Sequence, residues 1–228
     1  MGSFFGEGDW LGALRVRAYI DGLNLFYGSL KGHPERKWLD IVGMIESLRP
    51  DDKIDVVRYF TAPVSGKFDQ ACPQRQDTYM RALRGAHALE RLTILPGRFR
   101  SHPVEMPLVT PPANGPRFAT VWKTEEKGSD VNLASYLLLD GFDGLYDLAV
   151  VVSNDSDLKE PIRIANERFA PVHIVRPNKN YLTEMASAAA SYTSLPVAVI
   201  LANQLPSVVK LANGKTVTRP LDWTPHSN

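Results

Sequence analysis

The sequence predicts an α/β fold of three layers, in which helices cover both faces of a mostly parallel central sheet. Short apolar runs that resemble strands alternate along the chain with longer segments of helical periodicity, and this alternation is typical of βαβ units. The chain has 228 residues, of which 44% are hydrophobic and 22% are charged. These values are close to those of an average globular protein and argue against a disordered chain.

The predicted strands are short apolar stretches bounded by turn residues. In chain order they cover residues 16–20, 54–60, 92–95, 119–123, 148–153 and 172–175. The run that begins at Leu148 is the clearest, because consecutive apolar residues are typical of a strand that is buried on both faces. Residues 101–116 are rich in Pro, and we expect a loop or a loose hairpin there.

The predicted helices are longer segments, most of which have apolar residues at helical spacing, whereas 131–139 is mostly apolar and 181–192 is rich in Ala and Ser. They cover residues 38–48, 74–89, 131–139, 158–169 and 181–192. Residues 197–202 fit either a strand or a helix. We therefore expect a flexible extension over residues 1–14, one domain over residues 15–206 and a C-terminal tail over residues 207–228.

Composition excludes several classes of protein. The 26 Lys and Arg residues nearly balance the 25 Asp and Glu residues, so the overall charge gives no argument for nucleic-acid binding. The single cysteine, Cys72, excludes an internal disulfide framework and favours a reducing compartment, so we expect a cytoplasmic protein. No apolar stretch approaches the ~20 residues that span a bilayer, and we expect no membrane partner. The loops that bind dinucleotides and nucleoside triphosphates are also absent from the sequence.

Acidic residues follow two of the best strands and begin one helix. Asp21 comes directly after the first predicted strand, and Asp155 and Asp157 follow the run 148–153. Asp130 stands at the start of the helix 131–139. Because parallel strands end at the same edge of a sheet, we expect these carboxylates to face one crevice.

Clustered carboxylates repel one another, and a divalent cation is the usual means of neutralising them. A ligand set made only of oxygens favours Mg²⁺ or Mn²⁺ over zinc. Such an ion polarises a phosphate and activates water, so the residues alone suggest a metal-dependent hydrolase of phosphate esters.

Each acid also has a purely structural interpretation. Asp21 and Gly22 could form a turn that ends a strand. Asp157 could cap the next helix, with Glu160 completing a capping box. Asp130 would be favoured by the dipole at any helix N-terminus. Two acidic strand ends together with an acidic helix start exceed what these interpretations predict jointly.

Three segments of the chain resemble the signature segments of NYN domains, which belong to the PIN-like nuclease superfamily. They are Ile20-Asp21-Gly22-Leu23-Asn24, Lys127-Gly128-Ser129-Asp130-Val131 and Val152-Ser153-Asn154-Asp155-Ser156-Asp157-Leu158. Their order and separation also match, and the resemblance extends over about residues 16–206. The sequence departs from the family at Asn154, where members usually carry Gly.

The resemblance implies a metal-dependent endoribonuclease with a Mg²⁺ or Mn²⁺ site. On that basis, Asp21 would be a principal metal ligand, and Asp130 and Asp155 would complete the metal-binding set. Asn24 would support the site by hydrogen bonding to the substrate or to Asp21, and Asp157 would be a more peripheral catalytic acid. The implied partner is an RNA substrate. The sequence is also compatible with a homo-oligomer.

Contacts with the substrate are expected from hydroxyl and basic side chains. Ser153 and Ser156 lie in the same turn as Asp155, and Lys123 and Lys127 flank the expected pocket. The stretch between Pro73 and His102 is rich in arginine. Its Arg81 and Arg84 stand three apart on one predicted helix face, where they could bind phosphates or form only a solvated surface.

Two other functions remain as alternatives. A nuclease fold could serve as an RNA-binding or interaction module without turnover. A phosphatase of the haloacid-dehalogenase type also places Asp at strand ends, but it needs an Asp-x-Asp pair on the first strand, and here the second position is Leu23.

Overall fold

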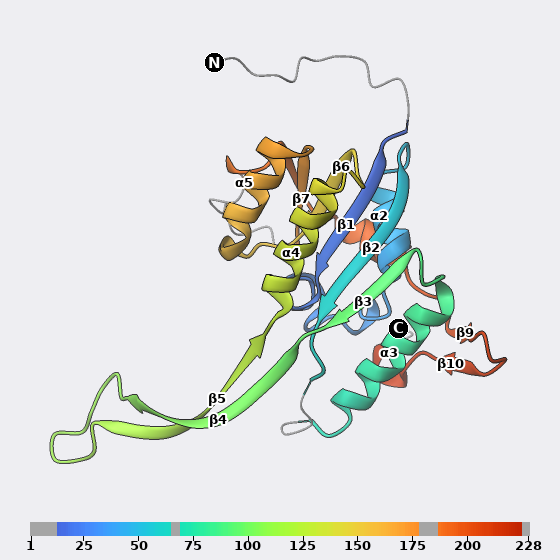
Figure 1. Ribbon diagram of the computed structural model, residues 1–228. Helices are drawn as coiled ribbons and strands as arrows, with labels where there is room; N and C mark the ends of the chain where they lie inside the picture. The colour runs from blue at the N-terminus through green and yellow to red at the C-terminus, as the bar shows by residue number, and fades with distance from the viewer. Residues whose placement is uncertain (1–12, 65–68, 178–186, 225–228) are drawn as a thin grey trace.

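The computed structural model describes residues 13–64, 69–177 and 187–224. Its central sheet has six strands in the order β3-β2-β1-β6-β7-β8, and each neighbouring pair is parallel. These strands are β1 (Arg15–Asp21), β2 (Lys53–Thr61), β3 (Leu92–Pro96), β6 (Leu148–Val152), β7 (Val172–Arg176) and β8 (Ser191–Ser194). Helices cover both faces of the sheet (Figure 1), so the predicted three-layer α/β/α fold is confirmed.

The order of the strands places a topological switch point beside β1. The first part of the chain adds β2 and β3 on one side of β1, and the second part adds β6, β7 and β8 on the other. The crossover connections therefore leave β1 and β6 in opposite directions, which opens a crevice beyond their carboxyl ends. This crevice is where open α/β sheets bind their ligands.

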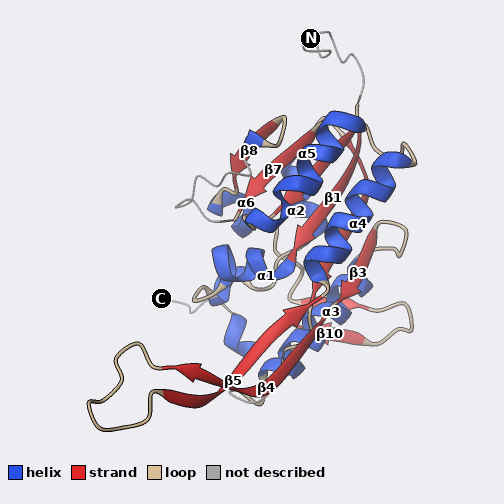
Figure 2. Ribbon diagram, turned by 60° about the vertical axis from the view of Figure 1, so that its left-hand side comes forward, coloured by secondary structure: helices blue, strands red, loops and turns tan. Residues whose placement is uncertain are grey.

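The α-helices form two layers, one on each face of the sheet, and successive side chains of a strand point to opposite layers. They are α1 (Gly22–Leu25), α2 (Ile41–Leu48), α3 (Cys72–Ala86), α4 (Ser129–Phe142), α5 (Lys159–Arg168) and α6 (Val197–Ala202). On β1, Ala18 and Ile20 join the core formed with α2, α3 and α6, whereas Tyr19 joins the core formed with α4 and α5. Figure 2 shows α4 and α5 side by side over one face. The alternation follows from the two-residue period of a strand. None of the helices in the described part of the chain has the length and apolar character needed to cross a membrane.

The helix expected over residues 181–192 is wrong at its C-terminal end. Residues 181–186 lie outside the described residues, but Ser191 and Thr193 belong to β8, which pairs with β7. His173 of β7 forms hydrogen bonds with Ser191 (Nδ1 to Oγ, 2.7 Å) and Thr193 (Nε2 to Oγ1, 3.0 Å). Pairing with a neighbouring strand thus outweighs the weak helical pattern of this segment. Residues 197–202, which fit either structure, form α6.

The stretch expected as a loop or a loose hairpin belongs to a long two-stranded ribbon, in which residues 101–107 lie in the first strand and residues 108–116 connect the two strands. The antiparallel strands β4 (Arg98–Pro107) and β5 (Phe118–Lys127) are paired over their whole lengths. Figure 1 shows the ribbon reaching away from the central sheet. Both strands of a ribbon are edges, and edges tolerate proline, so the Pro content of this segment does not exclude a strand.

The C-terminal segment completes the core on the side of α3. Its hairpin, β9 (Val208–Lys210) and β10 (Thr216–Thr218), contributes the buried Val209 and Val217. The 3₁₀ helix η5 (Leu221–Trp223) follows, and its Trp223 ring lies 6.3 Å from the Trp38 ring and 6.2 Å from the Tyr79 ring. The described part of the expected tail is therefore packed against the domain.

A buried ion-pair network fastens α4 to the sheet. Asp140, which is 3% exposed, receives two hydrogen bonds of 2.9 Å from Arg58 of β2 and pairs with Arg17 of β1 at 3.1 Å. The Tyr19 hydroxyl donates a further hydrogen bond of 2.8 Å to the same carboxylate. Burial and the neighbouring Asp140 charge raise the pKa of Tyr19 well above its usual value.

We expect Asp140→Ala to lower the free energy of unfolding by about 3 kcal/mol, because it removes the buried carboxylate that pairs with the half-buried Arg58 and Arg17, of which Arg17 keeps Asp55 as a partner. The matched control is Asp147→Ala, which removes the exposed pair with Arg15 and should cost about 0–1 kcal/mol. Urea denaturation followed by circular dichroism measures both values. Equal losses in the two variants would contradict the structural role given to Asp140.

Candidate functional site

The acidic residues predicted at the strand ends meet at the switch point. Asp21 is the last residue of β1, and Ser153 directly follows β6. Because Ile20 pairs with Val152 in the register of these strands, Asp21 and Ser153 lie next to each other. The Ser153 hydroxyl donates a hydrogen bond of 2.8 Å to Asp21 Oδ2. Ser153 is fully buried and its hydroxyl is used to position Asp21, while its contact with a substrate stays a prediction.

The turn after β1 holds the other oxygen of Asp21. The backbone N–H of Asn24 donates a hydrogen bond of 2.9 Å to Asp21 Oδ1, so Asp21 caps α1. A Cβ at Gly22 would lie 2.7 Å from the carbonyl oxygen of Phe60 in β2. Glycine is therefore required where the turn passes β2, and Asp21, which is 4% exposed, is fixed at both carboxylate oxygens.

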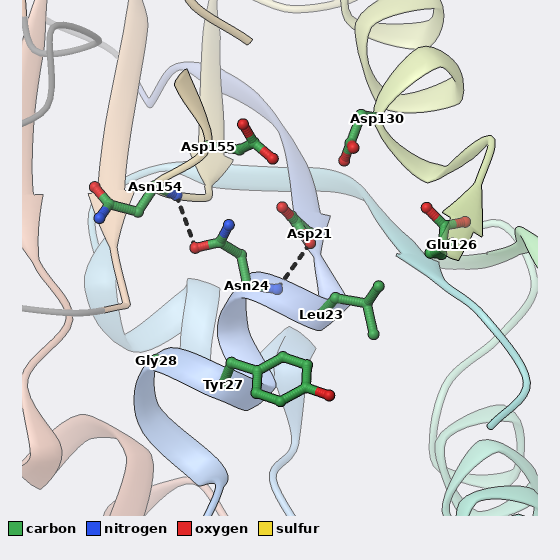
Figure 3. Close-up of a pocket in the computed structure, with 9 residues that line it drawn as sticks. All are labelled: Asp21, Leu23, Asn24, Tyr27, Gly28, Glu126, Asp130, Asn154 and Asp155. Carbon is green, nitrogen blue, oxygen red and sulfur yellow. Dashed lines mark hydrogen bonds between the residues drawn. The ribbon is translucent and has the colours of Figure 1, made fainter. Parts of the chain in front are cut away.

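The loop after β6 is joined to the turn after β1. The side-chain oxygen of Asn24 accepts a hydrogen bond of 3.1 Å from the backbone N–H of Asn154, and the Asn154 side chain points away from the acids (Figure 3). Among the described residues only glycines have positive φ, so Asn154 does not need the left-handed conformation. The backbone N–H of Asp155 donates a hydrogen bond of 3.1 Å to Ser153 Oγ, which holds Asp155 beside Asp21.

Asp130 comes to the same place from α4. Gly128, with φ +106°, makes the left-handed turn between β5 and α4 and places Asp130 in the first turn of the helix. The carboxylates of Asp21, Asp130 and Asp155 face one another (Figure 3), and one oxygen from each lies within 4.8 Å of the other two. The structure thus brings together the three residues that the sequence proposed as metal ligands.

A cavity of about 520 Å³ opens over these acids. It is lined by Asp21, Leu23, Asn24, Tyr27, Gly28, Glu126, Asp130, Asn154 and Asp155. Glu126, a fourth acid, was missed in the sequence, although it stands four residues before Asp130 at the end of β5. Its carboxylate accepts hydrogen bonds from the backbone N–H (3.2 Å) and hydroxyl (2.9 Å) of Ser129.

The site is rich in uncompensated negative charge. Burial raises the pKa of Asp21, and the nearby Asp155 charge adds to this effect, while hydrogen bonds from Asn24 and Ser153 oppose it. Burial, followed by the charges of Asp21, Asp155, Glu126 and Asp157, raises the pKa of Asp130 to about 6. These effects outweigh the favourable field that a helix N-terminus provides for an acid.

The donor set fits a hard divalent cation. Two oxygens on opposite sides of a Mg²⁺ ion, each at ~2.1 Å, are about 4.2 Å apart, which is close to the separation of at most 4.8 Å among the three carboxylate oxygens. The ligands are all oxygens, which suits Mg²⁺ or Mn²⁺. A bound cation would offset the repulsion that raises both pKa values.

The basic residues predicted to contact substrate do not line this cavity. Side chains alternate along β5, so Glu126 faces the cavity while Lys123 and Lys127 pair with Glu125, with Nζ to carboxylate distances of 2.7 and 3.4 Å. Arg81 and Arg84 lie on the exposed side of α3. Arg84 lines a separate hollow beside Pro63 and Pro96, and Arg81 pairs with Asp77 at 3.8 Å. None of these four basic residues lines the acidic cavity, and their contacts with a substrate stay predictions.

Ser156 and Asp157 also lie outside the cavity. Both are exposed in the 3₁₀ helix η3 (Ser156–Leu158). The predicted cap at Asp157 is wrong, because Asp155 caps this turn by accepting a hydrogen bond of 3.0 Å from the Asp157 backbone N–H. The extra turn of η3 moves the start of α5 past Asp157, and Glu160 pairs with Arg163 instead.

A second, apolar cavity of about 210 Å³ adjoins the acidic one. Leu23 and Tyr27 line both cavities. The other lining residues are Gly22, Phe26, Leu30, Lys37, Tyr59, Thr61, Val64, Cys72, Gln76, Tyr79, Met80, Phe99 and Trp223. Trp223 is one wall, so the C-terminal segment helps to form this cavity, and no signal in the sequence pointed to it.

Part of the chain is similar to a curated enzyme. No known protein-family model matches the chain. Over 174 residues the chain is 33% identical to the 6-hydroxy-3-succinoylpyridine 3-monooxygenase HspA of Pseudomonas putida (strain DSM 28022 / S16). The matched region covers 66% of this chain and 55% of the relative, so the chain spans about half the length of that enzyme.

A solved structure supports the fold alone. A protein of unknown function from Vibrio parahaemolyticus RIMD 2210633 superposes with a TM-score of 0.50 at 13% sequence identity. The match covers 86% of this chain and 97% of that one. The similarity therefore extends over nearly the whole described domain.

The charge cluster predicts a pH-dependent stability for the metal-free protein. An Asp carboxyl in an unfolded chain titrates at about pH 3.9, whereas Asp130 titrates at about 6 in the folded protein. Between these values the folded state binds more protons, so the contribution of Asp130 to stability falls as pH rises. We expect Asp130→Asn to raise Tm by roughly 2–4 °C at about pH 7.5, allowing for solvent screening. The gain should shrink as pH falls from about 6 towards 4.

Thermal unfolding in EDTA across this pH range measures the effect. The control is Asp51→Asn, which changes an exposed acid in the turn before β2, at the opposite edge of the sheet. A lower Tm for Asp130→Asn at about pH 7.5 would contradict the repulsion described here.

Proposed function

We propose that the protein is a divalent-metal-dependent endoribonuclease whose acidic centre is formed by Asp21, Asp130 and Asp155. The observation that carries this proposal is the convergence of three carboxylate oxygens within 4.8 Å at the switch point of a parallel sheet. The resemblance of the surrounding segments to NYN domains supports the choice of RNA as substrate. Under this proposal the chain is a member of that family.

A Mg²⁺ or Mn²⁺ ion held by these acids would polarise the scissile phosphate and activate water. Asp21 is the most firmly positioned ligand, because hydrogen bonds from Ser153 and Asn24 fix both of its oxygens. Asp130 and Asp155 are only half-buried and line the open cavity, so they can adjust to the ion and to substrate.

Two further residues that line the cavity can act on the water and on the substrate. Glu126 lines it without belonging to the cluster of three, so we assign to its carboxylate the acceptance of a proton from the attacking water. The Asn24 amide keeps the loop after β6 in place through its oxygen, and its nitrogen lies toward the acids (Figure 3). There it can donate a hydrogen bond to a phosphate oxygen.

The relative supports a second candidate function, oxidation of a small aromatic compound. Its name describes a monooxygenase that acts on a substituted pyridine, and the apolar cavity beside the acids has several aromatic walls. Monooxygenation needs O₂ and an electron donor, chemistry that proteins take from cofactors. Uptake of O₂ with 6-hydroxy-3-succinoylpyridine and a reduced nicotinamide or flavin, without RNA cleavage, would favour this candidate.

We expect Asp21→Asn to reduce Mn²⁺-dependent RNA cleavage by at least about a hundredfold, because loss of even an indirect contributor to a metal site costs 10–100-fold. The variant keeps the size of the side chain and removes a buried charge, which offsets the loss of one of the two hydrogen bonds that Asp21 accepts, so it should stay folded, as circular dichroism would verify. Cleavage of a labelled single-stranded RNA, measured across a Mn²⁺ titration, tests the expectation, with Asp51→Asn as control.

The same assay separates the alternatives. Undiminished RNA cleavage by purified Asp21→Asn protein would contradict the catalytic role of the acidic centre. Tight RNA binding by the wild type without cleavage in Mn²⁺ or Mg²⁺ would favour a binding module. Hydrolysis of a small phosphomonoester with intact RNA would favour a phosphatase.

A further inference from the structure

The apolar cavity lies directly behind the turn that carries Asp21. Leu23 and Tyr27 form a shared wall, with one side on the acidic cavity and the other on the apolar one. Gly22, the residue after Asp21, also lines the apolar cavity. One small molecule can therefore place an anionic group on a cation held by the acids and another part in the apolar cavity.

Aromatic side chains give the apolar cavity its character. Phe26, Phe99 and Trp223 are half-buried, so each has a surface that a ligand can cover. Tyr27 is 63% exposed at the shared wall. Flat side chains of this kind hold a planar ring by stacking.

Part of the cavity wall is held in place by contacts within the protein. Tyr79 donates a hydrogen bond of 2.6 Å to the carbonyl oxygen of Leu39, and its ring packs edge-on against Trp223. Gln76 donates to the carbonyl oxygen of Ala62 at 2.9 Å and accepts from the backbone N–H of Val64 at 2.8 Å. A preorganised wall reduces the cost of ordering side chains on binding.

The volume and charge of the apolar cavity limit the kinds of ligand that it can bind. The volume of about 210 Å³ is below the ~300–1,000 Å³ typical of sites for drug-sized molecules, which suits one small planar group. Among the described residues that line the cavity none is acidic, and Lys37 is its one basic residue. The cavity is thus electrostatically unlike the acidic one beside it, and Lys37 and Thr61 can contact the carbonyl edges of a ring.

We propose that this cavity binds the base of the nucleotide whose phosphate lies at the acidic centre. The assignment rests on the proposed function, because the acidic centre supplies the reason for choosing a nucleotide over another planar molecule. Base stacking is tolerant of sequence, so the cavity would hold any small base and would set the position of the scissile bond. A free aromatic acid would resemble a nucleotide only in having a planar ring that can stack in the cavity.

The single cysteine provides a direct reporter of occupancy. Cys72 is half-buried and lines the cavity, so a bound base should shield its thiol from iodoacetamide. At a ligand concentration about ten times the dissociation constant, the alkylation rate should fall about tenfold. The experiment follows alkylation of the full chain by intact mass, with AMP, GMP, CMP, UMP or adenosine, each with and without Mn²⁺.

Matched substitutions on the ribbon test the aromatic wall. Phe99→Ala should raise the nucleotide concentration needed for half-maximal protection by about five- to a hundredfold, because stacking on one aromatic ring contributes that much. Phe118→Ala makes the same change on β5 outside the lining of the cavity and should leave that concentration unaltered. Equal effects of the two substitutions would overturn the assignment of Phe99.

Metal dependence separates this inference from the proposed function. If both hold, Mn²⁺ strengthens protection by AMP but not by adenosine, and Asp21→Asn removes the increase. Equal protection by AMP and adenosine, unchanged by Mn²⁺, would support the base site and contradict the metal centre. Absence of protection by every nucleotide would overturn the base site, as would protection by 6-hydroxy-3-succinoylpyridine alone.

Discussion

The parallel pairing of β1 with β6 is the constraint on which the site depends. The register places Ile20 opposite Val152, and from there the chain brings Asp21 and Ser153 into hydrogen-bond contact at 2.8 Å. A shift of one residue would turn Asp21 to the opposite face of the sheet. It would also move Asp155 away, because its backbone N–H is held by the same Ser153 hydroxyl. One strand pairing thus fixes two of the three clustered acids.

The third acid belongs to a helix whose two ends treat carboxylates in opposite ways. In its last turns, α4 buries Asp140, whose charge is balanced by Arg17 and Arg58. In its first turn it presents Asp130, whose neighbours include Asp21 and other acids. The ion pairs of Asp140 fasten α4 to the sheet. Their contribution to stability offsets the destabilising repulsion around Asp130 at the other end of the helix. Because an uncompensated cluster lowers stability, the contrast suggests that it is kept for a ligand.

The central sheet and the three clustered acids could be predicted because both rest on local signals. Unbroken apolar runs such as β6 leave little choice of structure, and the rule that ligands bind beyond the carboxyl ends of parallel strands located Asp21, Asp130 and Asp155. Glu126 could not be found in this way. Its side of β5 is decided by the register with β4, and the same alternation directs Lys127 away from the cavity.

Elements that depend on distant partners were the ones that the sequence did not reveal. β8 is a strand because β7 offers an open edge, although its Ser and Thr residues carry no apolar pattern. The C-terminal segment reads as a tail, yet Trp223 packs on Trp38 and Tyr79, residues far away in the chain. The apolar cavity combines such distant pieces, from Phe26 to Trp223, so periodicity could not predict it.

The two adjoining cavities differ in character, since one is lined by acids and the other by aromatic side chains, and under our proposals the first would hold the metal and phosphate and the second the base. A crystal structure of the protein grown with Mn²⁺ tests the acidic metal centre. We predict an anomalous scattering peak at coordination distance from carboxylate oxygens of Asp21, Asp130 and Asp155. A well-ordered site without such a peak, at a Mn²⁺ concentration that saturates comparable carboxylate sites, would contradict the account.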